Sequence, residues 1–341
     1  MNKIPLKVVT CFTGIGFQER GIEDSGLFDM EVVKTCEMDS DAIVSYAAIH
    51  NGLTKEIVAD YPIYPSREEM AQELTDMHIG YDFLKDKPYD WQKLAKSKDS
   101  KMRLQTVWLA NKINNNVGDI TRVNKFPHCD LLTFSFPCTD ISIAGRQAGM
   151  VEGETRSGLV YEVLRILKNM KSEDNLPTYL LMENVDALVN KKNKPQYEAL
   201  NEEFSELGYD CKYEVINGKN CGVPQNRSRV FAIYWLRDKI DLSAFEFPQP
   251  FDDGRRLKDI LLDEVDEKYF ITNERAQALI RDLVMNDKVQ PTEETIKKQI
   301  GCDLTFRGSR VMEITSCITG RYDASICKHL LERTGVAVIK E

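Results

Sequence analysis

Short apolar runs that stop at glycine, proline or polar residues recur between residues 7 and 233. Runs bounded in this way are typical of buried strands, whereas apolar residues repeated at helical spacing, as in residues 39–50 and 159–168, predict helices. The alternation of the two patterns favours an α/β fold built on a mostly parallel sheet. The strands are expected at residues 7–12, 31–39, 131–134, 178–182, 213–216 and 230–233.

A glycine-rich turn follows the first of these strands. Gly14 and Gly16 form a G-x-G pattern between the strand at 7–12 and a short helical stretch, but the third glycine of the dinucleotide fingerprint is missing. The pattern alone is often only a tight turn. Glu37 ends the second strand, 23 positions after Gly14, where an acid commonly binds ribose hydroxyls. The two features together suggest a cofactor that carries a nucleoside.

Two further strand ends carry reactive side chains. Cys138 follows the run at 131–134, and Pro137 forces the chain out of the sheet directly before it. A random cysteine is more often a small buried residue, yet this position makes Cys138 a candidate catalytic thiol. Glu183 follows the run at 178–182, where it is either a general acid or a helix cap.

A basic turn leads into the last of these strands. Arg227 and Arg229 stand two positions apart, so their side chains point to the same side of an extended chain. Such a pair is more often a surface feature than a binding site. Residues 54–117 are charged, contain Trp91 and Trp108, and read as a mainly helical insertion whose simplest role is a solvated accessory layer.

Composition narrows the class of protein. The 341 residues, 42% hydrophobic and 29% charged, suit one large domain and a smaller one, and no apolar run is long enough for a membrane span. The nine cysteines include no CxxC pair, so neither a zinc site nor a disulfide framework is expected. We therefore expect the protein to reside in a reducing cytoplasm, where thiols stay free. The net charge of −9 argues against bulk affinity for nucleic acid but allows a local basic cleft.

Taken in order, these pieces resemble the cytosine-C5 DNA methyltransferases. The resemblance rests on FTGIG at 12–16, Glu37, GDI at 118–120, FPC at 136–138, ENV at 183–185 and QNRSR at 225–229. It implies a Rossmann-like sheet that binds S-adenosylmethionine, with helices on both faces, and a smaller target-recognition domain. Residues 1–237 would form the catalytic domain, including the insertion, and residues 238–341 the recognition region.

The resemblance also implies a role for each matching residue. Cys138 would attack C6 of a cytosine flipped out of duplex DNA, Glu183 would hold N3 and the amine, and Arg229 would contact O2 with Arg227 in support. Ser142 would lie in a loop that closes over DNA, and Arg307 and Arg310 would contact DNA. No metal is expected. The residues implied for S-adenosylmethionine are Phe12, Gly14, Gly16, Glu37, Met38, Asp119, Pro137 and Leu159.

The sequence departs from the family pattern in three places. Thr10 stands where the family usually has an acid, and the insertion at 54–117 is long. The family's last helix, which packs beside the cofactor turn, is not recognised, and a strand-like run at 336–341 stands in its place. A second polypeptide could complete the chain, the chain could be truncated, or the insertion could take over the packing.

Three functions are therefore carried forward. The first is methylation of cytosine in a specific sequence of double-stranded DNA, in the cytoplasm of a bacterial or phage-infected cell, as in restriction–modification. The second is methylation of cytosine in RNA by a related enzyme. The third is an inactive or partial DNA-binding subunit that needs a partner chain.

Overall fold

The structure is a computed structural model that describes residues 3–82, 87–97, 100–141, 149–256, 259–260, 302–303, 315–316 and 336–337. It divides the chain into two compact units. The first consists of Met1–Glu214 and Val230–Phe245, and the second of Val215–Arg229 and Glu246–Glu341. None of the helices in this described part combines the length and the apolar character that crossing a bilayer requires.

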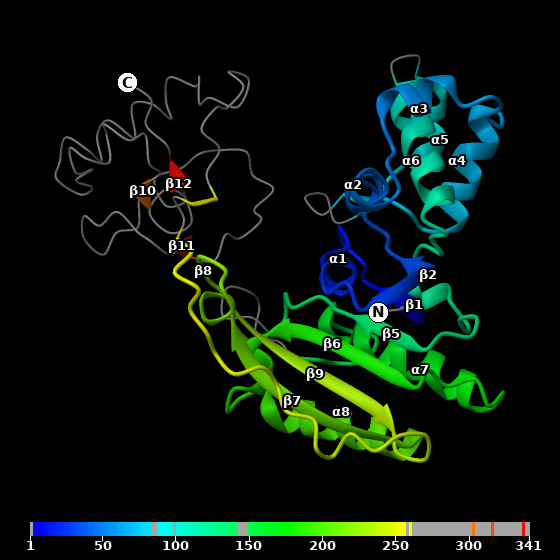
Figure 1. The fold of residues 1–341 in the computed structure, drawn as a ribbon. Helices are drawn as coiled ribbons and strands as arrows, with labels where there is room; N and C mark the ends of the chain where they lie inside the picture. The colour runs from blue at the N-terminus through cyan, green and yellow to red at the C-terminus, as the bar shows by residue number, and fades with distance from the viewer. Residues whose placement is uncertain are drawn as a thin grey trace. The chain divides into compact units, whose positions relative to one another are not determined.

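A six-stranded sheet with the order β2-β1-β5-β6-β9-β7 organises the fold (Figure 1). Each strand forms where an apolar run predicts one, although several are longer than expected, and β6 continues through Val185 instead of ending before Glu183. The strands are β1 Ile4–Cys11, β2 Phe28–Cys36, β5 Leu131–Phe134, β6 Tyr179–Val185, β7 Tyr209–Asn217 and β9 Ser228–Leu236.

The parallel part of the sheet contains a reversal of strand order. β1 pairs in parallel with β2 on one side and with β5 on the other, and β5 pairs in parallel with β6. Because the chain winds outward in both directions from β1 and β5, the crevice beyond their carboxyl ends, at Cys11 and Phe134, is where this class of sheet binds ligands.

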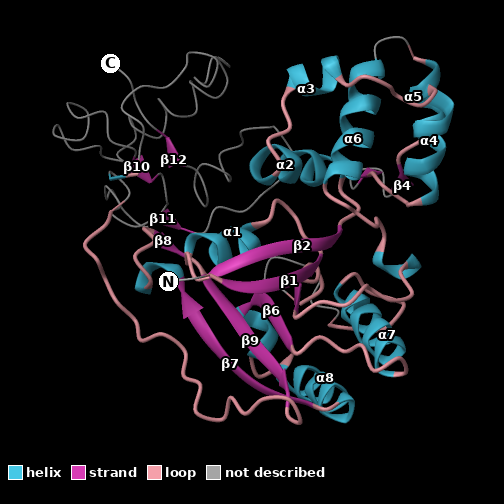
Figure 2. Cartoon of the chain, turned by 45° about the vertical axis from the view of Figure 1, so that its right-hand side comes forward, coloured by secondary structure: helices cyan, strands magenta, loops and turns pink. Residues whose placement is uncertain are grey.

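Helices cover both faces of the sheet. Right-handed connections that wind in opposite directions place α1 and α7 on opposite faces, and Figure 2 shows α7 and α8 together on one of them. This arrangement confirms the expected α/β class. The helices of this part are α1 Phe17–Asp24, α2 Ser40–His50, α7 Val160–Lys171 and α8 Lys194–Leu207, with the short 3₁₀ helices η2 Ile120–Arg122, η3 Ser157–Leu159 and η4 Asp186–Val189.

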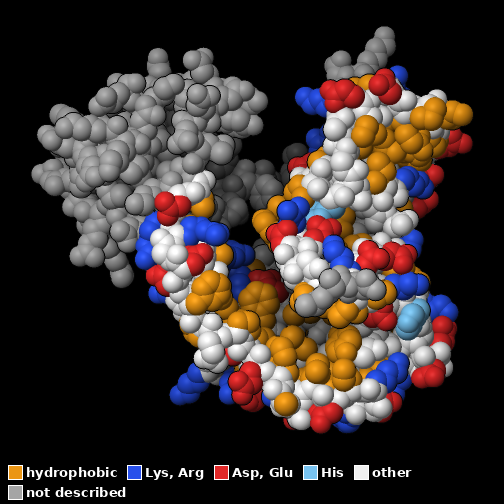
Figure 3. Space-filling model, in the orientation of Figure 1, with side chains coloured by type: hydrophobic (Ala, Val, Ile, Leu, Met, Phe, Trp, Pro, Cys, Tyr) orange, Lys and Arg blue, Asp and Glu red, His pale blue; other side chains and the backbone are white. Residues whose placement is uncertain are grey.

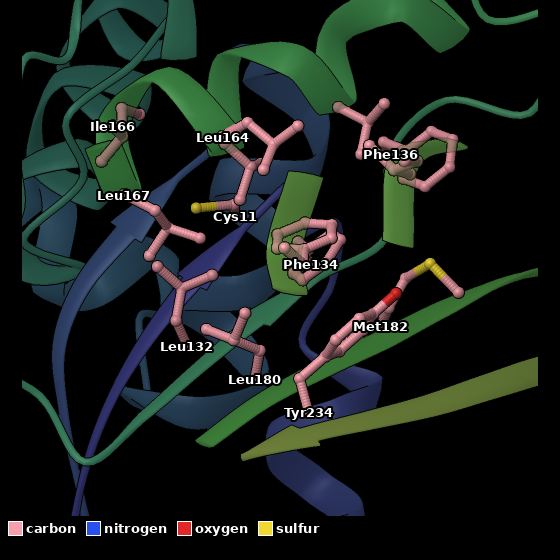
Figure 4. Close-up of a cluster of buried hydrophobic side chains, with 14 of the residues drawn as sticks. Cys11, Leu132, Phe134, Phe136, Leu164, Ile166, Leu167, Leu180, Met182 and Tyr234 are labelled. Atoms are coloured by element: carbon pink, nitrogen blue, oxygen red, sulfur yellow. The ribbon is translucent and has the colours of Figure 1, made fainter. Parts of the chain in front are cut away.

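The main core lies between the sheet and α7. Leu132 and Phe134 of β5 and Leu180 and Met182 of β6 are fully buried against α7 residues such as Leu164 (Figure 4). Burial alternates along β6, so the residues between these apolar ones, Glu183 among them, point to the opposite face. The core therefore fixes the direction in which the Glu183 side chain leaves the strand.

The strand β9 runs against β6. Leu236 N donates to Thr178 O at 3.0 Å, so the end of β9 lies beside the start of β6, and the two arrows in Figure 1 point in opposite directions. Val230 consequently lies toward the end of β6 that carries Glu183.

The insertion forms a helical layer with a core of its own, as the sequence predicts. Trp91, Leu74 and Leu104 are buried in this second core, and Ile43 and Ala47 of α2 belong to it too. Helix α2, which follows β2 in the chain, therefore packs on α6 of the layer. The layer consists of α3 Lys55–Asp60, α4 Arg67–Asp76, the short hairpin strands β3 Tyr81–Asp82 and β4 Lys87–Pro88, α5 Trp91–Lys96 and α6 Lys101–Ile113.

The described part of the second unit consists of short elements. β8 Gln225–Asn226 pairs in parallel with β11 Thr315–Ser316, and β10 Cys302–Asp303 pairs antiparallel with β12 Val336–Ala337. Part of the strand-like run expected at 336–341 is thus a strand. The 3₁₀ helix η5 Gly218–Asn220 precedes β8.

One buried side chain joins the accessory layer to the end of β2. Asn116 Oδ1 accepts from Glu37 N at 2.9 Å and from Thr35 Oγ1 at 3.2 Å, while its Nδ2 donates to Glu37 O at 2.9 Å and to Asn111 Oδ1 at 2.8 Å. The side-chain amide therefore pairs with both the N–H and the C=O of Glu37, as the backbone of a neighbouring strand would. It holds the backbone of Glu37 in place.

Replacing Asn116 by alanine leaves these buried groups without a partner. We expect Asn116→Ala to lower the free energy of unfolding by about 2–3 kcal/mol. Urea titration followed by tryptophan fluorescence measures the change, because Trp91 and Trp108 lie in the accessory core. Gln105→Ala, at a partly exposed position of α6, is the control and should shift stability by less than about 0.5 kcal/mol. Equal stability of the two variants would contradict the assigned role.

Candidate active site

The segment after β5 is held from two sides. Asn184 Nδ2 donates to Phe136 O at 2.9 Å, and Ser157 Oγ donates to Pro137 O at 2.7 Å. Phe136 is buried in the main core, so the chain leaves the sheet at a fixed point. Cys138, immediately beyond, is partly exposed and packs at the edge of that core.

Other thiols of the first unit lie in a different environment. Burial raises the pKa of Cys129 and of Cys211 to about 12, and the interaction with Cys11 together with burial raises the pKa of Cys36 well above its usual value. These thiols stay protonated and inert at neutral pH. Cys138 stands apart from them because it lies at the mouth of the sheet.

A hydrogen-bond chain reaches Glu183 from the glycine turn. Gln18 Nε2 donates to Ser135 Oγ at 2.6 Å, and Ser135 Oγ donates to Glu183 Oε2 at 3.0 Å. Gln18 is the second residue of α1, and Ser135 directly follows β5. The chain thus places the carboxylate beside the segment that carries Cys138, which lies three residues after Ser135.

The glycine turn has an unusual backbone. Phe12, Gly14 and Gly16 all have left-handed φ angles, of 55°, 56° and 83°. For Phe12 this conformation is strained, and strain of this kind persists mainly where the surroundings hold it for function. Phe12 N donates to Cys36 O at 2.8 Å, which ties the turn to the end of β2.

Glu37 completes the turn. Its Oε2 accepts from Gly14 N at 2.8 Å, and its Oε1 accepts from Met38 N and Asp39 N, each at 2.8 Å. Burial raises the pKa of Glu37, and these backbone donors oppose that rise. A carboxylate has about four acceptor positions, so Oε2 keeps one for a hydroxyl of a ligand.

Asp119 and Met38 lie beside the accessory layer. Asp119 Oδ1 accepts from Thr121 N at 3.0 Å, and its Oδ2 lies 3.1 Å from Nδ1 of His78, a residue of the insertion. Gly80 N donates to Met38 O at 2.7 Å. The insertion therefore forms one wall of the region in which these two expected cofactor residues lie.

A carboxyl group from elsewhere in the chain lies near Thr10, the position at which the family usually has an acid. Glu19 of α1 is buried; burial raises the pKa of Glu19, and the neighbouring Thr10 side chain opposes that rise. A carboxyl group thus reaches Thr10 from the helix that follows the turn. The sequence shows no signal of this, because Glu19 reads as an ordinary helix residue.

The remaining expected site residues are distributed as follows. Pro137 and Leu159 are partly buried, and Leu159 packs against the main core. Arg227 and Arg229 belong to the second unit, where Arg229 Nη1 donates to Ser228 O at 2.6 Å. The three residues expected to contact DNA, Ser142, Arg307 and Arg310, lie outside the described residues.

The charge pattern of the first unit is mixed. On the face that Figure 3 shows, acidic and basic side chains are interspersed with apolar ones and do not gather in a field of one sign. No group of three or more His, Cys, Asp or Glu side chains among the described residues is arranged to hold a metal ion.

Known proteins resemble this chain over most of its length. A model of the C-5 cytosine-specific DNA methylase family matches residues 92–326. The type II methyltransferase M2.ScrFI of Lactococcus lactis subsp. cremoris is 33% identical over 286 residues, 82% of this chain and 74% of that protein. The orphan methyltransferase M.SssI of Spiroplasma monobiae is 35% identical over 271 residues, 79% of this chain and 68% of that protein.

A solved structure shares the fold. A variant of DNMT2 from Spodoptera frugiperda superposes with a TM-score of 0.51 at 16% identity, covering 96% of this chain and 73% of that one.

The two glycines of the turn should respond differently to substitution. Both have left-handed φ angles, so alanine at either position costs about 1–2 kcal/mol. A Cβ added at Gly16 would also collide with His50 Nε2 and lie 2.7 Å from Tyr46 Cε2, whereas at Gly14 it meets no described atom within 4 Å. We therefore expect Gly16→Ala to lose about 1–3 kcal/mol more stability than Gly14→Ala in urea titration. Equal losses would show that the turn can widen.

Proposed function

The chain belongs to the C-5 cytosine-specific DNA methylases, which depend on S-adenosylmethionine, and we propose that it methylates C5 of a flipped-out cytosine in duplex DNA through a covalent adduct with Cys138. The observation that carries this proposal is the hydrogen bond from Ser135 to Glu183. It brings a carboxylate to the segment that bears the thiol, at the sheet edge where the glycine turn also lies.

The covalent step follows from the chemistry of the base. C5 of cytosine is a poor nucleophile, and adding the Cys138 thiolate to C6 moves electron density onto C5. The Glu183 carboxyl group, in its protonated form, would donate to N3 and accept from the exocyclic amine, so the negative charge that develops on the ring is offset. S-adenosylmethionine, when bound, supplies the methyl group as an electrophile on a sulfonium sulfur. Loss of the C5 proton and expulsion of the thiolate from C6 then restore the aromatic ring and the free Cys138.

The target base must leave the duplex for this to happen. Flipping costs a few kcal/mol, about the strength of several contacts in a pocket. Arg229 would contact O2 of the cytosine and steady Glu183, with Arg227 in support. Ser142, Arg307, Arg310 and a recognition role for residues 238–341 complete the proposal on the DNA side.

The glycine turn and the acids around it fit the cofactor. The left-handed backbone at Phe12, Gly14 and Gly16 opens the turn, and Glu37 keeps an acceptor position for a ribose hydroxyl. Met38 would pack on the adenine, and Asp119 would accept a hydrogen bond from its amine. Pro137 and Leu159 would border the same space.

Replacing the thiol tests the covalent step directly. Cys138→Ala should abolish transfer of tritiated methyl groups to duplex DNA, while binding of S-adenosylhomocysteine stays within about two-fold of the wild type, because the thiol makes no contact that the cofactor needs. Cys221→Ala, at another partly exposed thiol, is the control and should keep full activity. Loss of cofactor binding together with activity would mean that Cys138 is structural.

The same assay separates the competing functions. The wild-type chain alone should methylate duplex DNA and not tRNA, and bisulfite mapping of DNA from expressing cells should show one recognised sequence. Methylation of tRNA would support the RNA enzyme instead. Activity that requires an added second polypeptide would support the partial subunit.

The hydroxyl of Ser135 should matter to catalysis without contacting either substrate. Removing it in Ser135→Ala deprives Glu183 of a donor, so we expect kcat to fall about ten-fold. KM for S-adenosylmethionine and the melting temperature should stay near their wild-type values. Ser172→Ala, a hydroxyl deletion at the far end of α7, is the control. An unchanged kcat would contradict the role of Ser135 in orienting Glu183.

A further inference from the structure

The accessory layer meets Asp119 through a helix end of unusual composition. After α4 the chain turns at His78, whose N donates to Thr75 O at 3.0 Å, while Ile79 N donates to Leu74 O at 2.9 Å. This pair of hydrogen bonds is a Schellman motif, and His78 occupies its left-handed position with φ 53°. Glycine is the usual residue there, and any other L residue costs about 1–2 kcal/mol.

A histidine at this position is held by what its side chain contacts. Nε2 of His78 lies 2.6 Å from Nη1 of Arg122, and its Nδ1 lies 3.1 Å from Oδ2 of Asp119. A guanidinium can only donate, so Nε2 is the acceptor, and the hydrogen of the neutral ring sits on Nδ1. The direction of the chain is therefore set: Arg122 donates to His78, and His78 donates to Asp119.

The backbones of the two segments are also in direct contact. Asp119 N donates to Met77 O at 3.1 Å. A Cβ at Gly118, whose φ is 79°, would collide with the carbonyl oxygen of Met77. The loop that carries Asp119 therefore has little freedom to move away from His78.

These contacts orient the Asp119 carboxylate but do not use all of its hydrogen-bond acceptor positions. Oδ1 accepts from Thr121 N and Oδ2 from His78, so each oxygen keeps an acceptor position. The Asp119 side chain is 16% exposed, whereas the His78 side chain is half exposed. Asp119 can thus accept a further hydrogen bond from a ligand while His78 holds it from the other side.

We propose that His78 is a positioning residue that orients Asp119 toward the exocyclic amine of the cofactor's adenine, so that the accessory layer contributes to cofactor recognition. The proposal rests on the role of Asp119 given under the proposed function. His78 touches neither the methyl group nor the cytosine. Its effect is confined to the purine end of the cofactor and to the presence or absence of an amine at the purine 6-position.

The test compares two ligands that differ only at that position. S-adenosylhomocysteine carries the 6-amine, and the analogue with unsubstituted purine as its base carries a hydrogen in its place. Calorimetric titration of the full chain should show that His78→Gly binds S-adenosylhomocysteine about ten-fold more weakly than the wild type, the loss of one hydrogen bond to a charged group. Binding of the unsubstituted-purine analogue should change by less than about two-fold, because its C6–H offers Asp119 no hydrogen-bond donor.

One further variant and a melting measurement make the result decisive. His78→Asn keeps a side-chain donor and tolerates a left-handed backbone, so it should recover part of the preference for the amine. Glycine suits the Schellman position, so His78→Gly should melt no lower than the wild type, which excludes a general loss of structure. Equal weakening of both ligands in His78→Gly, or no weakening of either, would overturn the proposal.

Asp119→Ala identifies which assignment fails. If this variant loses the preference for the amine and His78→Gly keeps it, Asp119 recognises adenine without help from His78, and only the present proposal is wrong. If Asp119→Ala keeps the preference, the role of Asp119 is wrong, and the proposal for His78 falls with it.

Discussion

The hydrogen bond between Ser135 and Glu183 joins the carboxyl ends of two parallel strands, and the geometry of the catalytic edge depends on it. Parallel pairing of β5 and β6 brings Phe134 level with Met182, so the next residue on each strand meets its neighbour across the edge. Ser135 can reach Glu183 only in this register. A shift by one residue would turn Glu183 into the apolar core and leave the thiol segment without its carboxylate.

Gln18 extends the same contact to the glycine turn. It stands two residues after Gly16, and its amide reaches Ser135 at 2.6 Å. The turn proposed to hold the cofactor and the carboxylate proposed to hold the base therefore share one chain of hydrogen bonds. Reaction at C5 needs the two substrates in a fixed relation, and a connection of this kind supplies part of that preorganisation.

Strand positions and the order of the motifs could be read from the sequence, because buried strands and polar strand ends leave a local pattern. The helical character of residues 54–117 and the end of α8 at Gly208 follow from local signals too. Ile49, in contrast, fits the apolar face expected for residues 39–50 but is 52% exposed, because α2 packs on α6 of the accessory layer and leaves Ile49 to solvent. Local periodicity cannot show against which element a helix packs.

The partners of the expected site residues could not be read in the same way. Gln18 contacts Ser135 across 117 positions of sequence, and His78 meets Asp119 across 41. Such pairs form only when the sheet and the accessory layer have folded. His78 carried one weak hint, a polar residue two positions before Gly80 at the end of a helical stretch, which is typical of a helix end and carries no chemistry on its own. Glu19 carried none.

The packing of helix α2 on the accessory layer limits how far the protein can be shortened by engineering. Its Ile43 and Ala47 are buried among residues of the insertion, and its N-cap, Asp39, lies two residues after Glu37. Shortening the enzyme by splicing residue 53 to residue 118 would uncover this apolar flank and remove Asn116, which holds the backbone of Glu37. A miniature version of this enzyme would thus require a redesigned α2 surface, since the insertion is not a detachable module.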